Sequence, residues 1–272
     1  MVNLLVAAAV SLALPAGSPT VNASPASANI DAAPAMFVVG DGDTTVYVFG
    51  TFHALDGRSD WFDHSVRDAF ERSDELILET MLPEGPQPAP ARGIFGPPQV
   101  APSASFVATT RMAINAGKAQ GMQADNGADM VLRHAAEEEG KPVAGLETLE
   151  SQLAMFTRMS RLAPVAPTPA VATPASRSAM VELARSMDAM QSAWKRGDQR
   201  VFVNMLGQLN QASPASYKML FTDRNGRWAD WIAARLQTPG TVFVAVGAGH
   251  LVGNDSLLVQ LAQRGIGSRR VY

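Results

Sequence analysis

Two short copies of one arrangement constrain the fold of this chain more than any other feature. Val46–His53 and Thr241–His250 each contain an apolar run rich in β-branched residues that stops at a glycine, and a histidine follows three positions later. Such runs are typical of buried strands, and the glycine allows a sharp turn where the strand ends. Because open α/β sheets bind ligands beyond the carboxyl ends of their strands, we expect the imidazoles of His53 and His250 to meet in one pocket. The alternative is two unrelated strand ends followed by polar loop residues.

The order of the predicted elements indicates an α/β protein. Apart from the two strands that lead to the histidines, strands are expected at 36–39, 75–78, 142–146 and 269–272. Helices are expected in most of the remaining chain, among them one over 128–139 and one long helix over 214–237. Strands near both ends of the chain must pair with one another, so we expect a mixed central β-sheet formed by the N- and C-terminal parts, with a largely helical cap.

The first 30 residues are expected to be an export signal. The apolar run Leu4–Leu14 has the length of a signal-peptide core and is too short to span a bilayer. Ala26-Ser27-Ala28 has the small-x-small form of a cleavage site. We therefore expect a periplasmic or secreted mature protein with no later transmembrane segment, folded as one domain over 31–272. Irregular Pro-rich segments are expected at 83–103 and 163–175.

Composition excludes several classes of function. The chain has no cysteine, which rules out a thiol nucleophile, a disulfide framework and a zinc–thiolate site. Its net charge is only −3 and its basic residues are scattered, so no nucleic-acid partner is expected. The Gly-x-Ser-x-Gly, P-loop and His-Glu-x-x-His motifs are absent, which argues against an ordinary serine hydrolase, an NTPase and a zincin. Any bound metal would need histidine and carboxylate ligands.

Histidine or glutamate follows a predicted strand at four places. His53 and His250 are joined by Glu79 and Glu147, each of which directly follows an apolar run. These residue types can form a divalent metal site or an acid–base pair. For Glu147 the alternative is a helix N-cap or a first-turn acid, because Thr148 and a predicted helix follow it.

One arginine and the two remaining histidines complete the set of candidates. Arg224, next to Asn225, could bind a substrate carboxylate or carbonyl oxygen through its planar fork. A surface ion pair is the alternative for this arginine. His64 and His134 lie inside predicted helices and are expected to be solvated.

Taken together, these segments resemble the TraB/GumN family, also called the Tiki-like family. The resemblance covers residues 36–272, and the matching segments are Val46–Leu55, Asp74–Thr80, Gly127–Asp129, Gly140–Gln152, Trp194–Asp198, Arg224-Asn225 and Gly247–Leu251. It implies a fold related to erythromycin-esterase-like and haem-binding ChaN-like proteins. It also implies that His53 and His250 are the motif histidines and that Arg224 is the arginine of an Arg-Asn pair. Glu79 and Glu147 then match the acidic positions of the family.

Animal members of the Tiki type are similar to metal-dependent proteases, so the resemblance predicts a metal-dependent hydrolase, and specifically a peptidase. In this hypothesis His53 and His250, with Glu79 or Glu147, bind Mn²⁺, Co²⁺ or Zn²⁺, which activates a water molecule. The other of these two glutamates acts as general base, and Arg224 steadies the oxyanion or the peptide or small-molecule substrate. Two alternatives stay open: a metal-independent, esterase-like hydrolase with a histidine as general base, and an envelope protein that binds haem or polysaccharide without turnover.

Overall fold

A mixed β-sheet lies at the centre of the computed structural model, which describes residues 33–58, 60–81, 114–162 and 174–271. Its strands are β1 (Met36–Gly40), β2 (Thr44–Thr51), β3 (Glu75–Thr80), β4 (Val143–Glu147), β5 (Gly240–Gly247) and β6 (Arg269–Arg270). Their order is β4-β3-β5-β2-β1-β6, in which β4, β3, β5 and β2 are parallel and β1 runs antiparallel to both β2 and β6. The prediction of a mixed α/β sheet built from both ends of the chain is confirmed.

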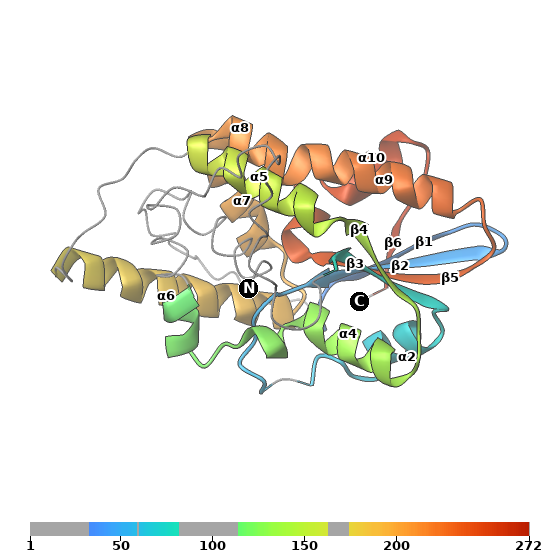
Figure 1. The fold of residues 1–272 in the computed structure, drawn as a ribbon, viewed down its shortest axis with the longest axis horizontal. Coiled ribbons are helices and arrows are strands. Elements are labelled where there is room, and N and C mark those ends of the chain that lie inside the picture. Colours follow the sequence, from blue (N-terminus) through green and yellow to red (C-terminus); the bar gives the residue numbers. More distant parts are fainter. Residues whose placement is uncertain (1–32, 59, 82–113, 163–173, 272) are drawn as a thin grey trace, which may run out of the picture.

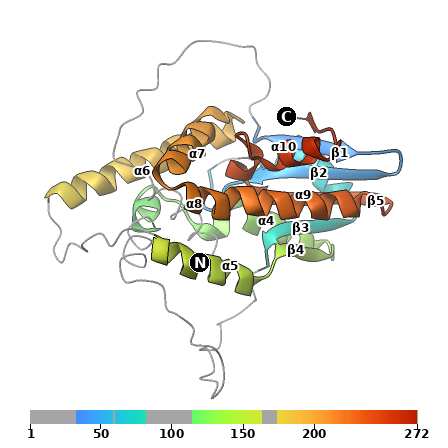
Figure 2. The same cartoon turned by 90° about the horizontal axis from the view of Figure 1, so that it is seen from above.

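Helices cover both faces of the sheet and the carboxyl ends of its parallel strands (Figures 1 and 2). One face carries α2 (His64–Glu71) and α4 (Ala128–Glu138), and the other carries α9 (Asp223–Arg235) and α10 (Leu257–Gln263). Beyond the strand ends lie α5 (Leu149–Leu162), α6 (Pro174–Lys195), α7 (Arg200–Ala212) and α8 (Pro214–Tyr217). Shorter elements are a helix over 114–119, 3₁₀ turns η1 (Ala124–Asn126) and η3 (Ala248–Leu251), and a π-helix η2 (Lys218–Thr222). In the part of the chain described, no helix is long and apolar enough to cross a membrane.

The central strands are apolar between their ends because both faces of the sheet are buried. In β5, Val242, Val244 and Val246 pack into one core together with residues of α9 and α10. Phe243 and Ala245 point to the opposite core, which includes residues of α2 and α4. The period of two along each strand thus divides the hydrophobic residues between two layers, and the strand ends remain the place where polar side chains collect.

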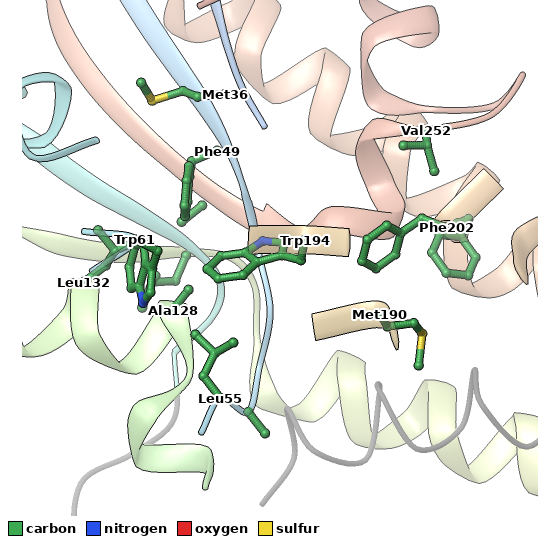
Figure 3. Close-up of a cluster of buried hydrophobic side chains, with 14 of the residues drawn as sticks. Met36, Phe49, Leu55, Trp61, Ala128, Leu132, Met190, Trp194, Phe202 and Val252 are labelled. Carbon is green, nitrogen blue, oxygen red and sulfur yellow. The ribbon is translucent and has the colours of Figure 1, made fainter. Parts of the chain in front are cut away.

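Trp194 of α6 joins the helical cap to the sheet. Its indole N–H donates a hydrogen bond of 2.7 Å to the carbonyl oxygen of Gly50 at the end of β2. Its ring lies among other buried aromatic side chains in Figure 3, with ring centroids 5.5 Å from Trp61 and 6.3 Å from Phe49. Met187 and Met190 of the same helix are buried in this core, so these two methionines serve packing.

The structure corrects one predicted element and leaves others outside its description. The helix predicted over 214–237 is divided into α8, the π-helix η2 and α9. The expected export signal at 1–30 and the irregular segment at 83–103 lie outside the described residues. The same holds for 163–173 of the second Pro-rich segment, whereas α6 already begins at Pro174.

We expect Trp194→Phe to lower the free energy of unfolding by about 1–3 kcal/mol, because the variant leaves the buried Gly50 carbonyl without this donor. Urea unfolding measures the difference. Trp231→Phe on α9 is the matched control, since this tryptophan is only partly buried. Equal losses in the two variants would contradict the role given to the indole hydrogen bond.

Candidate functional site

The polar residues predicted from the strand ends meet at one edge of the sheet. His53 follows β2, Glu79 is the next-to-last residue of β3, and Glu147 is the last residue of β4. His250 lies in η3, which follows β5 directly. Because β5 lies between β2 and β3 in the parallel part of the sheet, the carboxyl ends of all four strands adjoin.

Gly247 marks the centre of this site. A Cβ atom at this position would lie 3.3 Å from His53 Nε2, 3.5 Å from Glu79 Oε2 and 3.6 Å from His250 Cδ2. The backbone N–H of Gly247 donates to Glu79 Oε2 over 3.2 Å. The glycine that ends the second motif therefore lets both histidines and the first glutamate approach the backbone closely.

His53 is held in place from α4. Its Nδ1 is 3.1 Å from Asp129 Oδ1, and both side chains are buried. The backbone N–H of Ala128 bonds to the carbonyl of Phe52, and a Cβ atom on Gly127 would come within 2.3 Å of the His53 carbonyl oxygen. The start of α4 therefore needs glycine at this close approach, which sets Asp129 beside the imidazole.

The surroundings of His53 favour its protonated form. Burial alone would lower the pKa of the imidazole, but the neighbouring Asp129 carboxylate outweighs burial, with a smaller contribution from Glu79. The pKa of His53 therefore lies above its usual value. Asp129 binds Nδ1 of the imidazole, and the other ring nitrogen, Nε2, is the one that lies beside Gly247.

Arg224 joins the two glutamates. Its fully buried guanidinium donates from Nη2 to Glu79 Oε1 over 2.5 Å, and its Nη2 lies 2.9 Å from Glu147 Oε2. Its Nε donates to both oxygens of Glu147, over 3.0 and 3.1 Å. The surface ion pair considered as an alternative for Arg224 is wrong, because this side chain has an exposed fraction of 0%.

The π-helix η2 ends two residues before Arg224. Its last residue is Thr222, and α9 begins at Asp223. A π-helix has wider turns than an α-helix and is frequent at functional sites. The sequence pattern predicts an uninterrupted helix here because a single wide turn does not change the spacing of apolar residues enough to reveal it.

His250 is fixed as a neutral imidazole with its proton on Nδ1. Asn225 Nδ2 donates to the backbone carbonyl of Asp255 over 2.7 Å, so its Oδ1 accepts from His250 Nδ1 over 2.7 Å. His250 Nε2 then accepts from Arg224 Nη1 over 3.3 Å. Burial and the Arg224 charge lower the pKa of His250 to about 3.

Glu79 is ionised in this site. Burial would raise the pKa of its carboxyl group, but the charge of Arg224 and the two histidines hold the pKa well below its usual range. Gln152 of α5 also donates to Glu79 Oε1, over 3.4 Å. Both carboxylate oxygens are thus engaged, one by side-chain donors and the other by the backbone of Gly247.

The donor atoms, as they are arranged, do not fit a divalent metal site. Within the ranges that the structure describes, no three His, Asp or Glu side chains are grouped so as to hold a metal ion. The lone pair of His250 Nε2 faces a guanidinium, and the donor atoms nearest to a Cβ at Gly247 are His53 Nε2 and Glu79 Oε2. A zinc-type site uses at least three protein donors. The metal-binding roles of His53, His250 and Glu79 stay predictions.

Sequence reasoning missed Asp129 and gave no role to Asn225 or Gln152. Asp129 is buried beside His53, although its position near the start of α4 looks like an ordinary first-turn acid. Its membership of the matching Gly127–Asp129 segment was the only signal. The two remaining histidines, His64 and His134, are exposed on α2 and α4, as expected.

The fold and the site define an α/β protein with a buried cluster of histidine, carboxylate and arginine at the carboxyl edge of its parallel strands. The model of the TraB/PrgY/gumN family matches residues 35–95 and 96–270, so the chain belongs to this family. It is similar to the uncharacterized protein YbaP of Escherichia coli strain K12 and to YbaP of Shigella flexneri, with 32% identity over 156 residues in each case. The similarity covers 54% of this chain and 52% of each relative, about half of their length. No solved structure matches the chain.

The lowered pKa of His250 predicts that the protein loses stability as the pH falls below the unfolded value of about 6.5. The unfolded chain takes up a proton there that the native imidazole does not, so acid favours unfolding. Between pH 6.5 and 5, we expect His250 to contribute a loss on the order of 1 kcal/mol.

Urea unfolding of wild type, His250→Gln and His134→Gln at these two pH values tests this. The loss should shrink in His250→Gln and persist in His134→Gln, whose histidine is exposed. The range avoids the titration of Glu79, whose stabilising effect is present above the unfolded pKa of about 4.3. An unchanged loss in His250→Gln would contradict the assignment.

Proposed function

We propose that this chain is a hydrolase that cleaves an ester or amide bond of a small molecule or peptide, with His53 as the general base. The observation that carries the proposal is the approach of His53 Nε2 and Glu79 Oε2 to Gly247 while Asp129 holds His53 Nδ1. A histidine oriented by a carboxylate through one nitrogen, with the other nitrogen beside a second carboxylate, is an arrangement that suits a general base.

The proposed reaction follows from these contacts. A water molecule between His53 Nε2 and Glu79 Oε2 gives a proton to Nε2 while its oxygen attacks the substrate carbonyl carbon. The carbonyl oxygen gains negative charge, which the buried Arg224 stabilises because charges interact strongly in a desolvated site. His53 then returns the proton to the leaving alcohol or amine as its bond to the carbonyl carbon breaks. Asp129 stabilises the imidazolium between the two transfers.

Three finer expectations from the sequence belong to the same proposal. The arrangement of the sheet and cap would be that of the erythromycin-esterase-like and ChaN-like proteins. The apolar run near the N-terminus would export the protein to the periplasm or beyond the cell. The substrate would be a peptide, as the similarity to Tiki-type proteases suggests, or a small ester.

The metal-dependent hydrolase predicted from the sequence is the second candidate. Two observations favour it: His53 Nε2 and Glu79 Oε2 both approach Gly247, and the His250 tautomer carries its lone pair on Nε2 with Nδ1 bonded to Asn225. Metal-bound histidines commonly show such a partner on their second nitrogen. Mn²⁺, Co²⁺ or Zn²⁺ would supply a polarised water and a Lewis acid when bound. Hydrolysis that stops with EDTA and returns with one of these ions would favour this candidate.

Replacing His53 tests the proposed base. We expect His53→Ala to hydrolyse p-nitrophenyl acetate or peptide p-nitroanilides about 10²–10⁴ times more slowly than wild type, the usual contribution of a general base. His64→Ala is the matched control because His64 is exposed on α2, and it should keep the full rate. Equal rates in the two variants, or no hydrolysis of any ester or amide by wild type, would contradict the proposal.

Adding a methyl group at Gly247 tests the same point without removing a polar group. The backbone at Gly247 has φ −52° and ψ 134°, which alanine also adopts, so Gly247→Ala should fold. Its methyl group would lie 3.3 Å from His53 Nε2 and 3.5 Å from Glu79 Oε2, the two atoms between which the water is proposed, and we expect at least about a tenfold loss of hydrolysis. Gly207→Ala on α7 is the control, because a Cβ atom there meets nothing within 4 Å. Full activity in a folded Gly247→Ala protein would place the water elsewhere.

A further inference from the structure

The guanidinium of Arg224 occupies the point where the two glutamates and His250 converge. Each of its nitrogens has a partner: Nη2 bonds to Glu79 and Glu147, Nε to Glu147, and Nη1 to the Leu220 carbonyl and to His250. The guanidinium carbon also lies 4.6 Å from the centre of the Trp228 ring. The side chain is therefore enclosed on several sides by groups that favour a positive charge.

The contacts of His250 fix the position of the Arg224 side chain. The chain from the Asp255 carbonyl through Asn225 fixes the proton on Nδ1 and directs the lone pair of Nε2 at Arg224 Nη1. The His250 ring also packs against Trp228, with centroids 4.4 Å apart, and Trp228 in turn lies beneath the guanidinium. A metal ion at Nε2 would have to displace the guanidinium from this nitrogen.

The charges of the site are already balanced. Two carboxylates, Glu79 and Glu147, face two arginines, because Arg227 Nη2 also bonds to Glu147 Oε1 over 3.2 Å. Asp129 likewise is paired with His53. A divalent ion added beside Arg224 would bring two further positive charges into a desolvated region, where uncompensated charge is costly.

We propose that Arg224 is the fixed cation of this site in place of a divalent metal ion, so that Glu79, Glu147 and His250 hold an arginine. The positive charge is then present at neutral and alkaline pH without uptake of a metal ion from solution, because a guanidinium does not lose its proton in proteins. This inference rests on the proposed function in one respect only, namely that the charge of Arg224 stabilises a carbonyl oxygen of the substrate. The identity of the cation itself can be tested without any substrate.

The test is metal binding by the purified protein, measured by isothermal titration calorimetry with Mn²⁺, Co²⁺ and Zn²⁺ and by elemental analysis. Wild type should show no stoichiometric binding that depends on His250. Arg224→Met, which keeps the bulk of the side chain and removes its charge, should bind at least one of the ions at least tenfold more tightly and gain thermal stability from it. Arg227→Met is the matched control, because this 62% exposed arginine contacts the same glutamate, and it should bind no better than wild type.

Two results would overturn the proposal. The first is one equivalent of metal in wild type that is lost in His250→Gln. The second is a folded Arg224→Met protein that binds no ion better than wild type does. If Arg224→Met does not fold, the wild-type measurement decides alone. Failure of the hydrolase proposal is recognised separately, by the absence of ester and amide hydrolysis in a wild-type protein whose metal content is known.

Discussion

The desolvated ion pairs of Arg224 are the interaction on which the rest of the site depends. Burying one guanidinium and two carboxylates is costly unless every donor and acceptor finds a partner. Here the arginine bonds to Glu79, Glu147, His250 and a backbone carbonyl, while Gly247 and Gln152 complete the shell of Glu79. Such a cluster adds little net stability compared with a hydrophobic core of equal volume, so its value to the protein lies in the charge that it keeps in place.

The sheet topology explains why these groups can meet. Parallel strands end at the same edge, and β5 lies between β2 and β3, so His53, Glu79 and the segment from Gly247 to His250 become neighbours. The helices on the two faces then contribute further polar groups: α4 brings Asp129 from one side, and α9 brings Arg224 and Asn225 from the other. The two histidines consequently receive opposite electrostatic surroundings, a carboxylate for His53 and a guanidinium for His250.

Sequence reasoning predicted the parts of the site that follow from strand endings. The repeated Gly-x-x-His motif placed His53 and His250 together, and the apolar runs before Glu79 and Glu147 placed both glutamates at the same edge. It could not find Asp129, since a first-turn aspartate in a helix is common for reasons unrelated to chemistry. Sequence reasoning also could not predict the π-helix before Arg224, because the spacing of hydrophobic residues does not reveal one extra residue in a helical turn. The contact of Arg224 with His250 distinguishes an arginine from a metal ion as the cation of the site. This contact depends on side-chain directions that no sequence pattern specifies.

The place of β5 in the sheet also has a consequence for how the protein is made. Strand β5 pairs with β2 on one side and β3 on the other, yet it is synthesised long after both of them. Until residues 240–247 leave the ribosome, the facing edges of β2 and β3 lack their native partner, and unpaired edges of this kind invite association with other chains. The segment 240–250 therefore closes the sheet and brings the second histidine in the same event, so a chain that still lacks this segment carries exposed strand edges and no assembled site.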